Sequence, residues 1–276
     1  MRANCVKTDR MHSLPAQVAE IWRLRALLLM MTSREVLARV KGTALGLIWL
    51  YAQPLLMVAA YYLVFAVVFK ARLGDEAPTH SLGVYLVVGM VPWIAFSDAV
   101  SRAMASLVEA GNLLQKNALA PALFPARMVA ASAVTYLPLI AGLALIAAAV
   151  NGFSLVLLWL PLLFAVQLLL AFLLGYALAI LAAAMRDMLQ LAVFLLSLGV
   201  FASPILFTVS MIPGEFRWLI WLNPMSPAIL AYQTVLLTGQ MPALETWAAL
   251  GAWLAGLALF LNRLIGRSGE HLVDWL

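Results

Sequence analysis

Apolar runs long enough to cross a lipid bilayer follow one another along most of this chain. A helix that crosses the hydrocarbon core needs roughly 20 apolar residues. Hydrophobic residues make up 65% of the 276 residues and charged residues 11%, whereas soluble domains have about 45–50% and about 25%. The bilayer core offers no hydrogen-bond partners, so a spanning backbone must satisfy itself. The predicted fold class is therefore an all-α integral membrane protein.

Six transmembrane helices are predicted, at 44–69, 82–107, 128–150, 155–184, 189–211 and 246–265. The fourth run is long for one crossing, so we expect tilt or a kink near Pro161. The apolar stretch Trp218–Leu237 contains Asn223-Pro224 and Pro227, and proline removes backbone donors. That stretch predicts short re-entrant external helices between spans five and six, rather than a seventh span.

Lysine and arginine are divided unevenly between the two sides of these spans. With six spans, fourteen cations lie on the side of the termini, eight of them before the first span, and three lie opposite: Lys70, Arg72 and Arg217. Short cytoplasmic segments carry the excess of Lys and Arg, so both termini are predicted to be cytoplasmic. The chain divides into a cytoplasmic or interfacial amphipathic segment, 1–43, and one six-span domain, 44–276.

The segment before the first span predicts a surface helix at Pro15–Met31. Its apolar residues fall on one arc, although Arg25 lies inside that arc: Val18, Ile21, Trp22, Leu28 and Leu29. Thr32 and Glu35 match a capping box, which predicts a break and a second helix, Ser33–Lys41. A basic helix with an apolar face lies in the membrane interface. Two interpretations stay open: a topology anchor alone, or a collar that also contacts a cytoplasmic partner.

The entry to the first span carries two glycines and a proline. Gly42 and Gly46 allow either a tight bend or close helix approach. Pro54 is expected to kink the first helix, with a neighbour such as Gln53 meeting the freed carbonyl.

No catalytic motif is present. The sequence lacks GxxxxGK[ST], GxSxG, HExxH and CxxC, and Cys5 is its single cysteine. The histidines, His12, His80 and His271, lie in separate polar segments, so neither a metal site nor a cofactor site is predicted on this chain. The net charge of +5 does not indicate nucleic acid, because the cations stand beside apolar runs.

Two groups of residues inside the spans carry functional hypotheses. Asp98 and Arg102 are one helical turn apart, which fits either a structural ion pair or a role in conduit lining or gating. Aromatic residues share a face at about 100° per residue, and such faces fit either packing and lipid contact or a surface along which sugar rings slide. These aromatic residues are Tyr51, Tyr62, Phe65 and Phe69 in the first span, and Tyr85 and Phe96 in the second.

The loop 107–127 predicts a short amphipathic helix, Asn112–Ala118, stopped by Pro121 and Pro125. It would expose Gln115, Lys116 and Asn117 and pack through Leu113, Leu114 and Leu119. A short helix parallel to the membrane fits either a simple connector or a surface on which a cytoplasmic motor pushes.

Four stretches, in this order, resemble the membrane subunits of ABC transporters of the type-2 exporter family, in particular the polysaccharide-export permeases. They are ARVKGTALGLIWLYAQPLL at the first span, VGMVPWIAFSDAV in the second, NLLQKNALAPALFPAR in the loop, and IPGEFRWLIWLNPMSPAILAYQTVLLTGQMP before the last span. The resemblance covers roughly residues 16–270. It is closer to the O-antigen and teichoic-acid branch than to the capsule branch.

The resemblance implies a homodimeric pore in the bacterial inner membrane, with ATP and Mg²⁺ on a separate ATPase subunit and a lipid-linked glycan as substrate. It assigns coupling to the ATPase to Asn112, Leu113, Leu114, Gln115, Lys116 and Asn117, aided by Arg186 and Asp187. It supports the aromatic residues above as the glycan conduit. If the lipid end of the substrate enters laterally beside the N-terminal segment, its headgroup or pyrophosphate would meet the basic side chains of Arg34, Arg39 and Lys41.

Three alternatives are weighed against this interpretation. A type-2 permease for a drug or a lipid fits the same six spans and loop. A membrane enzyme acting on lipid-linked sugars needs clustered acids or histidines, and the external cluster Asp75, Glu76 and His80 has the composition of a polar turn. A secondary transporter is expected to carry inverted repeats with paired broken helices, and none is visible.

Overall fold

Five long apolar helices dominate the part of the chain that the computed structural model describes, which is residues 13–41, 46–70, 73, 78–79, 81–117, 119–268 and 272–275. The five helices are Ile48–Val68, Leu82–Glu109, Leu123–Asn151, Leu155–Ala184 and Leu244–Ser268. Each has the length and composition of a membrane span. Throughout the described ranges the secondary structure is helical, without a β-strand. Five of the six predicted spans are thereby confirmed as helices.

The first and fourth of these spans change helix type along their length. The first consists of α4 (Leu47–Tyr62) and a π-helical turn, η1 (Leu63–Val68). The second and third are α5 (Leu82–Glu109) and α7 (Leu123–Asn151). The fourth begins as a 3₁₀ helix, η2 (Leu155–Trp159), and continues as α8 (Leu160–Ala184). Pro161 therefore occupies the first turn of α8, where proline is well tolerated, instead of kinking a longer helix.

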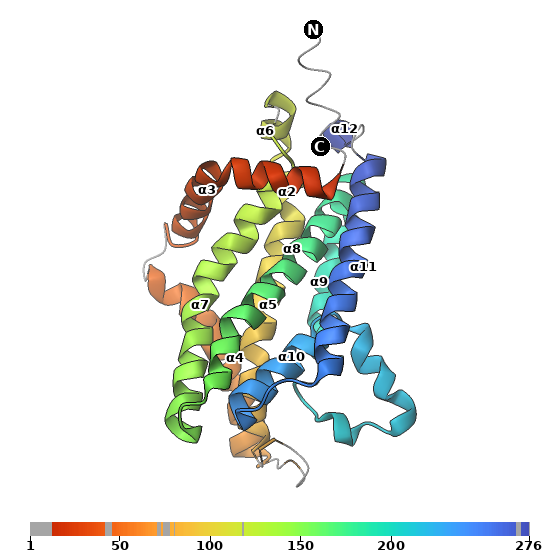
Figure 1. The fold of residues 1–276 in the computed structure, drawn as a ribbon. Helices are drawn as coiled ribbons and strands as arrows, with labels where there is room; N and C mark the ends of the chain where they lie inside the picture. The colour runs from red at the N-terminus through yellow and green to blue at the C-terminus, as the bar shows by residue number, and fades with distance from the viewer. Residues whose placement is uncertain are drawn as a thin grey trace.

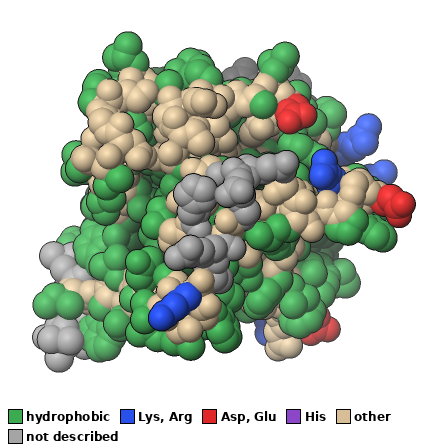
Figure 2. Space-filling model, turned by 90° about the horizontal axis from the view of Figure 1, so that it is seen from below, with side chains coloured by type: hydrophobic (Ala, Val, Ile, Leu, Met, Phe, Trp, Pro, Cys, Tyr) green, Lys and Arg blue, Asp and Glu red, His purple; other side chains and the backbone are tan. Residues whose placement is uncertain are grey.

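Short helices gather at one end of the bundle of long helices. That end carries α2 (Leu14–Arg23), α3 (Arg25–Ala38), α6 (Gly111–Lys116) and α12 (Leu272–Trp275) (Figure 1). The last long helix, α11 (Leu244–Ser268), rises to this end and precedes α12. Seen from the opposite end, the surface is largely hydrophobic with few Lys and Arg side chains (Figure 2).

The second span is the centre of the packing. Of the most apolar 18-residue stretch of α5, 72% is buried inside the protein, whereas the corresponding share in the first span is 11%. α5 packs most extensively against α7 and α8. A Cβ added at Gly175 of α8 would lie 2.6 Å from the Ala103 Cβ of α5, so the two helices approach as closely as small residues allow. The first span, by contrast, keeps most of its apolar surface exposed.

The predicted span 189–211 is wrong as a continuous helix. The helix there is α9 (Asp187–Gly199), about 20 Å long at about 1.5 Å per residue, which is shorter than the hydrocarbon core. Turns follow, because Pro204 cannot continue a helix. Side chains satisfy the freed backbone: Ser203 Oγ and Asn223 Nδ2 donate to the Gly199 carbonyl at 2.6 and 3.2 Å, and Gln233 Nε2 donates to that of Pro204 at 2.8 Å.

The stretch before the last span forms short helices, as predicted. They are η4 (Gly214–Leu222), α10 (Ser226–Gln233) and the π-helical η5 (Thr234–Thr238). The 3₁₀ turn η3 (Val209–Met211) precedes them, within the predicted fifth span. The break between η4 and α10 falls at Asn223-Pro224, and Pro227 occupies the first turn of α10. α10 packs against α5 and α11, so this segment folds back into the bundle.

The N-terminal segment differs from the prediction in where it breaks. The break lies at Leu24, between α2 and α3, and Thr32 is buried inside α3. The capping-box interpretation of Thr32 is therefore wrong. Tertiary contacts override the local signal: α2 is fixed to the bundle by the Tyr176 hydroxyl, which donates to Gln17 Oε1 at 2.5 Å, while α3 packs along α7.

The break changes which apolar residues face outward, and a bend follows the segment. Val18 and Trp22 point away from the bundle, whereas Ile21 packs against its core. Gly46, just before α4, has a φ of 55°, which favours glycine. The predicted tight bend is thus present there. Gly42, like Cys5 and the three histidines, lies outside the described residues.

Candidate functional site

The short helix α6 forms a projecting contact surface at the end of the bundle (Figure 1). It follows α5 after the single residue Ala110. Leu114 is buried and anchors the helix in the main core. The other predicted coupling residues are exposed: Asn112, Leu113, Gln115, Lys116 and Asn117. Leu113 was expected to pack, but its side chain is 43% exposed.

The ends of α6 are fixed by backbone and side-chain hydrogen bonds. At the C-terminal end, the backbone N–H and the Nδ2 of Asn117 both donate to the Leu113 carbonyl, at 3.0 and 3.1 Å. Ala118 lies outside the described residues. α7 begins at Leu123, earlier than predicted, and Pro125 lies in its first turn. α6 therefore lies between α5 and α7 in the chain and is anchored by Leu114.

The turn between α8 and α9 lies at the same end of the bundle. α12 contacts both α6 and α8, which places the C-terminal end of α8 near α6. Arg186 and Asp187, the remaining predicted coupling residues, are exposed at this turn. The structure therefore brings the two predicted groups to one end of the molecule.

A buried ion-pair network ties α3 to α5 and α7 beneath this end. The Arg39 side chain is 4% exposed, and its Nη1 lies 3.3 Å from Asp98 Oδ2. Arg39 Nη1 also donates to Thr135 Oγ1, and Nη2 donates to Ser132 Oγ, both at 3.1 Å. Ser132 in turn donates to Asp98 at 2.5 Å. Arg102 completes the network, with Nε 2.8 Å from Asp98 Oδ1.

The electrostatics of this network are dominated by the removal of Arg39 from water. Burial lowers the pKa of the Arg39 guanidinium, and the neighbouring Asp98 carboxylate opposes that effect. Arginine nevertheless stays protonated in proteins. Without Asp98 the charge would be left without a counter-ion, which is strongly unfavourable for a buried group. The predicted Asp98–Arg102 pair is confirmed, and Arg39 joins it.

This arrangement changes the interpretation of the three predicted headgroup residues. Arg39 is occupied by Asp98 and is nearly inaccessible, so its guanidinium is not free to bind a lipid headgroup in this conformation. Arg34 and Lys41 are exposed. Ser132 and Thr135 were not predicted. The sequence did contain a signal for them: two hydroxyl side chains stand three residues apart in an otherwise apolar helix, at the end of that helix nearest the loop 107–127.

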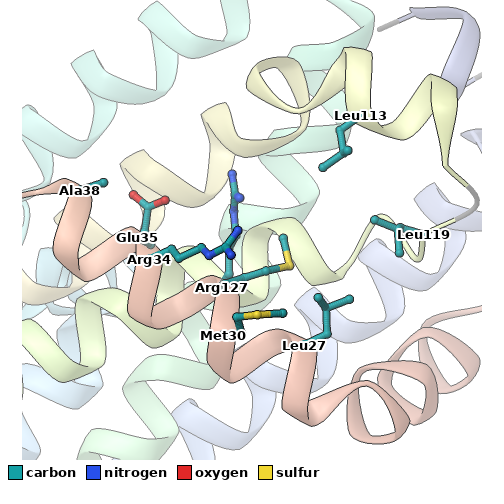
Figure 3. A pocket seen from close by; sticks show the side chains of 9 residues that line it. Leu27, Met30, Arg34, Glu35, Ala38, Leu113, Leu119 and Arg127 are labelled. Atoms are coloured by element: carbon teal, nitrogen blue, oxygen red, sulfur yellow. The ribbon is translucent and has the colours of Figure 1, made fainter.

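A pocket of about 420 Å³ lies beside the network, between α3, α6 and the start of α7 (Figure 3). Arg34 and Glu35 enter it from α3, and Arg127 enters it from α7. The rest of its wall is largely apolar: Leu27, Met30, Met31, Ala38, Leu113 and Leu119. Arg127 was not predicted, because the loop pattern alone gave it no partner.

The predicted aromatic conduit residues are divided between two environments. Tyr85 and Phe96 are 2% and 1% exposed, so both side chains are almost fully buried, and Phe96 alone borders a hollow. Tyr62 and Phe69 are exposed, and Tyr51 and Phe65 are half-buried. The single stripe is also interrupted, because the π-helical turn η1 changes the register after Tyr62. The rings that stack are those of Tyr61 and Phe65, with centroids 6.4 Å apart.

A second, larger hollow of about 810 Å³ lies between α5, α8, α9, η4 and α11. Its lining has no charged residue, and aromatic side chains contribute much of it: Trp93, Phe96, Phe201, Phe207, Phe216 and Trp253. Asn223, one of its polar lining residues, is already engaged with Gly199 and Ser203. The hollow is therefore an apolar groove.

A protein-family model matches most of this chain. The model described as "ABC-2 type transporter" matches residues 26–237. The chain belongs to the ABC-2 type transporter family. This permease is 29% identical over 244 residues to the O-antigen export system permease protein RfbA of Myxococcus xanthus, covering 85% of this chain and 89% of that protein. A protein with the same name from Klebsiella pneumoniae is 25% identical over 218 residues, covering 78% and 82%.

Family membership establishes the class of activity. This permease is a multi-pass membrane protein and a membrane subunit of an ABC transporter. Members of the family lack a catalytic domain, so the chain is not an enzyme, and the family implies a separate ATPase partner. The sequence contains no P-loop motif, which agrees with ATP hydrolysis on a separate subunit.

We predict that Asp98→Ala destabilises this ABC-2 permease much more than Arg102→Ala. Removing Asp98 leaves Arg39 buried without a counter-ion, at a cost of about 3 kcal/mol or more. The Arg102 side chain is 42% exposed, and such a partner contributes about 0–1 kcal/mol. Thermal unfolding in detergent measures the difference.

The double variant Arg39→Leu/Asp98→Leu serves as the control, because it removes both charges together. It should recover most of the stability that Asp98→Ala loses. Equal losses for Asp98→Ala and Arg102→Ala would contradict the central place of Arg39 in the network.

Proposed function

We propose that this chain is the permease subunit of an ATP-driven exporter of a lipid-linked polysaccharide, working as a homodimer with a separate ATPase subunit. The observation that carries the proposal is α6, a short exposed helix that projects beyond the bundle in an ABC-2 family member. Two relatives named as O-antigen export permeases support the class of cargo.

We propose that the end bearing α6 faces the cytoplasm. Of the thirteen described Lys and Arg residues, eleven lie at or near this end, and two, Lys70 and Arg217, lie toward the other. Such an imbalance sets orientation in membranes. Both termini would then be cytoplasmic, with residues 1–43 as an interfacial collar and 44–276 as the transmembrane domain. The fifth crossing would consist of α9 and the turns that follow it, and α11 would be the sixth.

Coupling to the ATPase is assigned to the exposed residues of α6, aided by Arg186 and Asp187. ATP closes the ATPase dimer, α6 moves with it, and the spans rearrange to open or advance a conduit. Energy enters only through contacts that differ between the two nucleotide states.

The coupling assignment predicts that Gln115→Ala/Lys116→Glu weakens the complex with the ATPase. Charge reversal at a partner surface creates like-charge contacts that cost several kcal/mol, so the copurifying ATPase should fall roughly tenfold or more. Tagged chain is purified from detergent-solubilised membranes, and bound ATPase protein and ATP hydrolysis are measured. Arg217→Glu, a charge reversal toward the opposite end, is the matched control. A chain that purifies without any nucleotide-hydrolysing subunit would contradict the assignment.

The export path is proposed to include the exposed aromatic side chains Tyr62 and Phe69, together with the folded-back helices η4 and α10 as an external, re-entrant gate. Flat aromatic faces suit the apolar faces of sugar rings. The aromatic groove between α8 and α9 offers a second such surface. Tyr85 and Phe96 would contribute by shaping the packing beneath it.

Loss of the chain should remove the polysaccharide from the cell surface and leave lipid-linked glycan inside the cell. The expected result in the native host is surface glycan restored by the wild type and by Arg217→Glu, and reduced severalfold or more by Gln115→Ala/Lys116→Glu. Antibody or lectin binding is compared between intact and lysed cells. Unchanged surface glycan together with lost efflux of a drug or a lipid would favour the alternative cargo.

The second copy is proposed to pack against the first span. Only 11% of the most apolar stretch of that span is buried within one chain, and the side chains of Ile48 and Leu56 are 61% and 63% exposed. α9 exposes a further apolar face that includes Phe194 and Leu195. Apolar faces in a membrane meet either lipid or another helix, and a pore made by two copies places these faces at its seam.

Cysteine cross-linking tests this seam, because Cys5 is the single native cysteine. In a Cys5→Ser background, Ile48→Cys or Leu56→Cys should give a covalent dimer on oxidation in native membranes. Leu145→Cys on α7, which is 72% exposed, is the control and should stay monomeric. A dimer formed equally well through Leu145→Cys would move the seam away from the first span.

A further inference from the structure

The pocket between α3, α6 and α7 holds two arginines that have no counter-ion within the described residues. Arg127 forms no ion pair there, its Nε is buried without a hydrogen-bond partner, and its guanidinium lies 5.4 Å from the centre of the Phe124 ring. Arg34 is exposed and makes no ion pair in the same part of the chain. Figure 3 shows both side chains extending into the same hollow from opposite walls.

The charges around this pocket do not balance. Glu35 is its one acidic lining residue, and within the described residues it forms no ion pair with Arg34 or Arg127. With the neighbouring Arg39–Asp98–Arg102 network, four guanidinium groups therefore face two carboxylates in this region. An excess of two positive charges at the edge of a membrane domain attracts a phosphate anion.

The remaining wall is apolar and adaptable. Leu27 and Met30 come from α3, and Leu113 comes from α6. Methionine fits irregular apolar shapes. A small hydrated anion would gain nothing from these side chains, whereas a phosphate attached to a hydrocarbon chain would bury that chain against them.

We infer that Arg34 and Arg127 form a binding site for an amphipathic phosphate, with its apolar chain against Leu27, Met30 and Leu113. This chemistry is shared by the anionic phospholipids of the bilayer and by the phosphate end of a lipid-linked glycan. The second source rests on the proposed function. Because Leu113 belongs to α6, the ligand would touch the same helix that is assigned to the ATPase.

The test measures binding to the purified full-length chain in a neutral detergent, without the ATPase. Three probes are titrated: a short-chain phosphatidic acid, farnesyl pyrophosphate, and inorganic pyrophosphate, which has no apolar chain. Native mass spectrometry counts the bound molecules, and the ligand-induced rise in Tm gives apparent affinity.

Arg34→Gln/Arg127→Gln should weaken binding of the two amphipathic probes roughly tenfold or more, because two charge-assisted hydrogen bonds are lost. Arg263→Gln/Arg267→Gln is the matched control: it removes two exposed arginines at the same end, outside the pocket. That variant should bind like the wild type. Inorganic pyrophosphate should bind at least tenfold more weakly than farnesyl pyrophosphate.

Equal weakening by the two double variants would overturn the site, because it would mark general attraction by surface charge. Unchanged binding by Arg34→Gln/Arg127→Gln would also overturn it. If Arg127 only packs on Phe124, Arg34→Gln/Arg127→Gln lowers the Tm without ligand and leaves the ligand-induced rise in Tm unchanged. A preference for farnesyl pyrophosphate over phosphatidic acid identifies the glycan lipid as the source, and the reverse identifies bilayer phospholipid. None of these outcomes alters the ATPase and surface-glycan experiments, so the site can fail while the proposed function stands.

Discussion

The hydrocarbon core supplies no hydrogen-bond partner to a backbone, and the irregular parts of this structure follow from that constraint. Where the helical ladder stops after α9, polar side chains take its place. Asn223 and Ser203 close the end of α9, and Gln233 satisfies the carbonyl of Pro204. These side chains come from the turn after α9, from the break between η4 and α10, and from the end of α10. The turns after α9 and the folded-back helices therefore depend on each other and form one unit.

Much of the helical framework could be predicted from the sequence, because five runs are long enough to require a span. The short helices η4 and α10 followed from Asn223-Pro224 and Pro227, since proline has only a few places in a helical bundle. The break at Leu24 could not be predicted. It depends on the contact of Gln17 with Tyr176, 159 positions away in the sequence, while the local pattern pointed to Thr32.

The candidate site shows the same division between local and tertiary information. α6 could be placed because its exposed polar residues and its anchor Leu114 lie within one turn of each other. The Asp98–Arg102 pair was visible for the same reason. Arg39 was assigned to a lipid headgroup because it stands in a basic stretch, but its partner comes from α5. Arg127 was missed because its pocket exists only once α3 lies across α7.

A chain of contacts connects the small projecting helix α6 to the rest of the bundle. α6 is separated from α5 by one residue, and α5 is the most deeply buried span. α5 carries Asp98, which holds α3 through Arg39 and α7 through Ser132. Under the proposed coupling, a displacement of α6 would act on α5 with only Ala110 between them. Spatial continuity is not coupling in itself. It becomes coupling when α5 and α3 make different contacts in two states, and an anion held between α3 and α6 is one such contact.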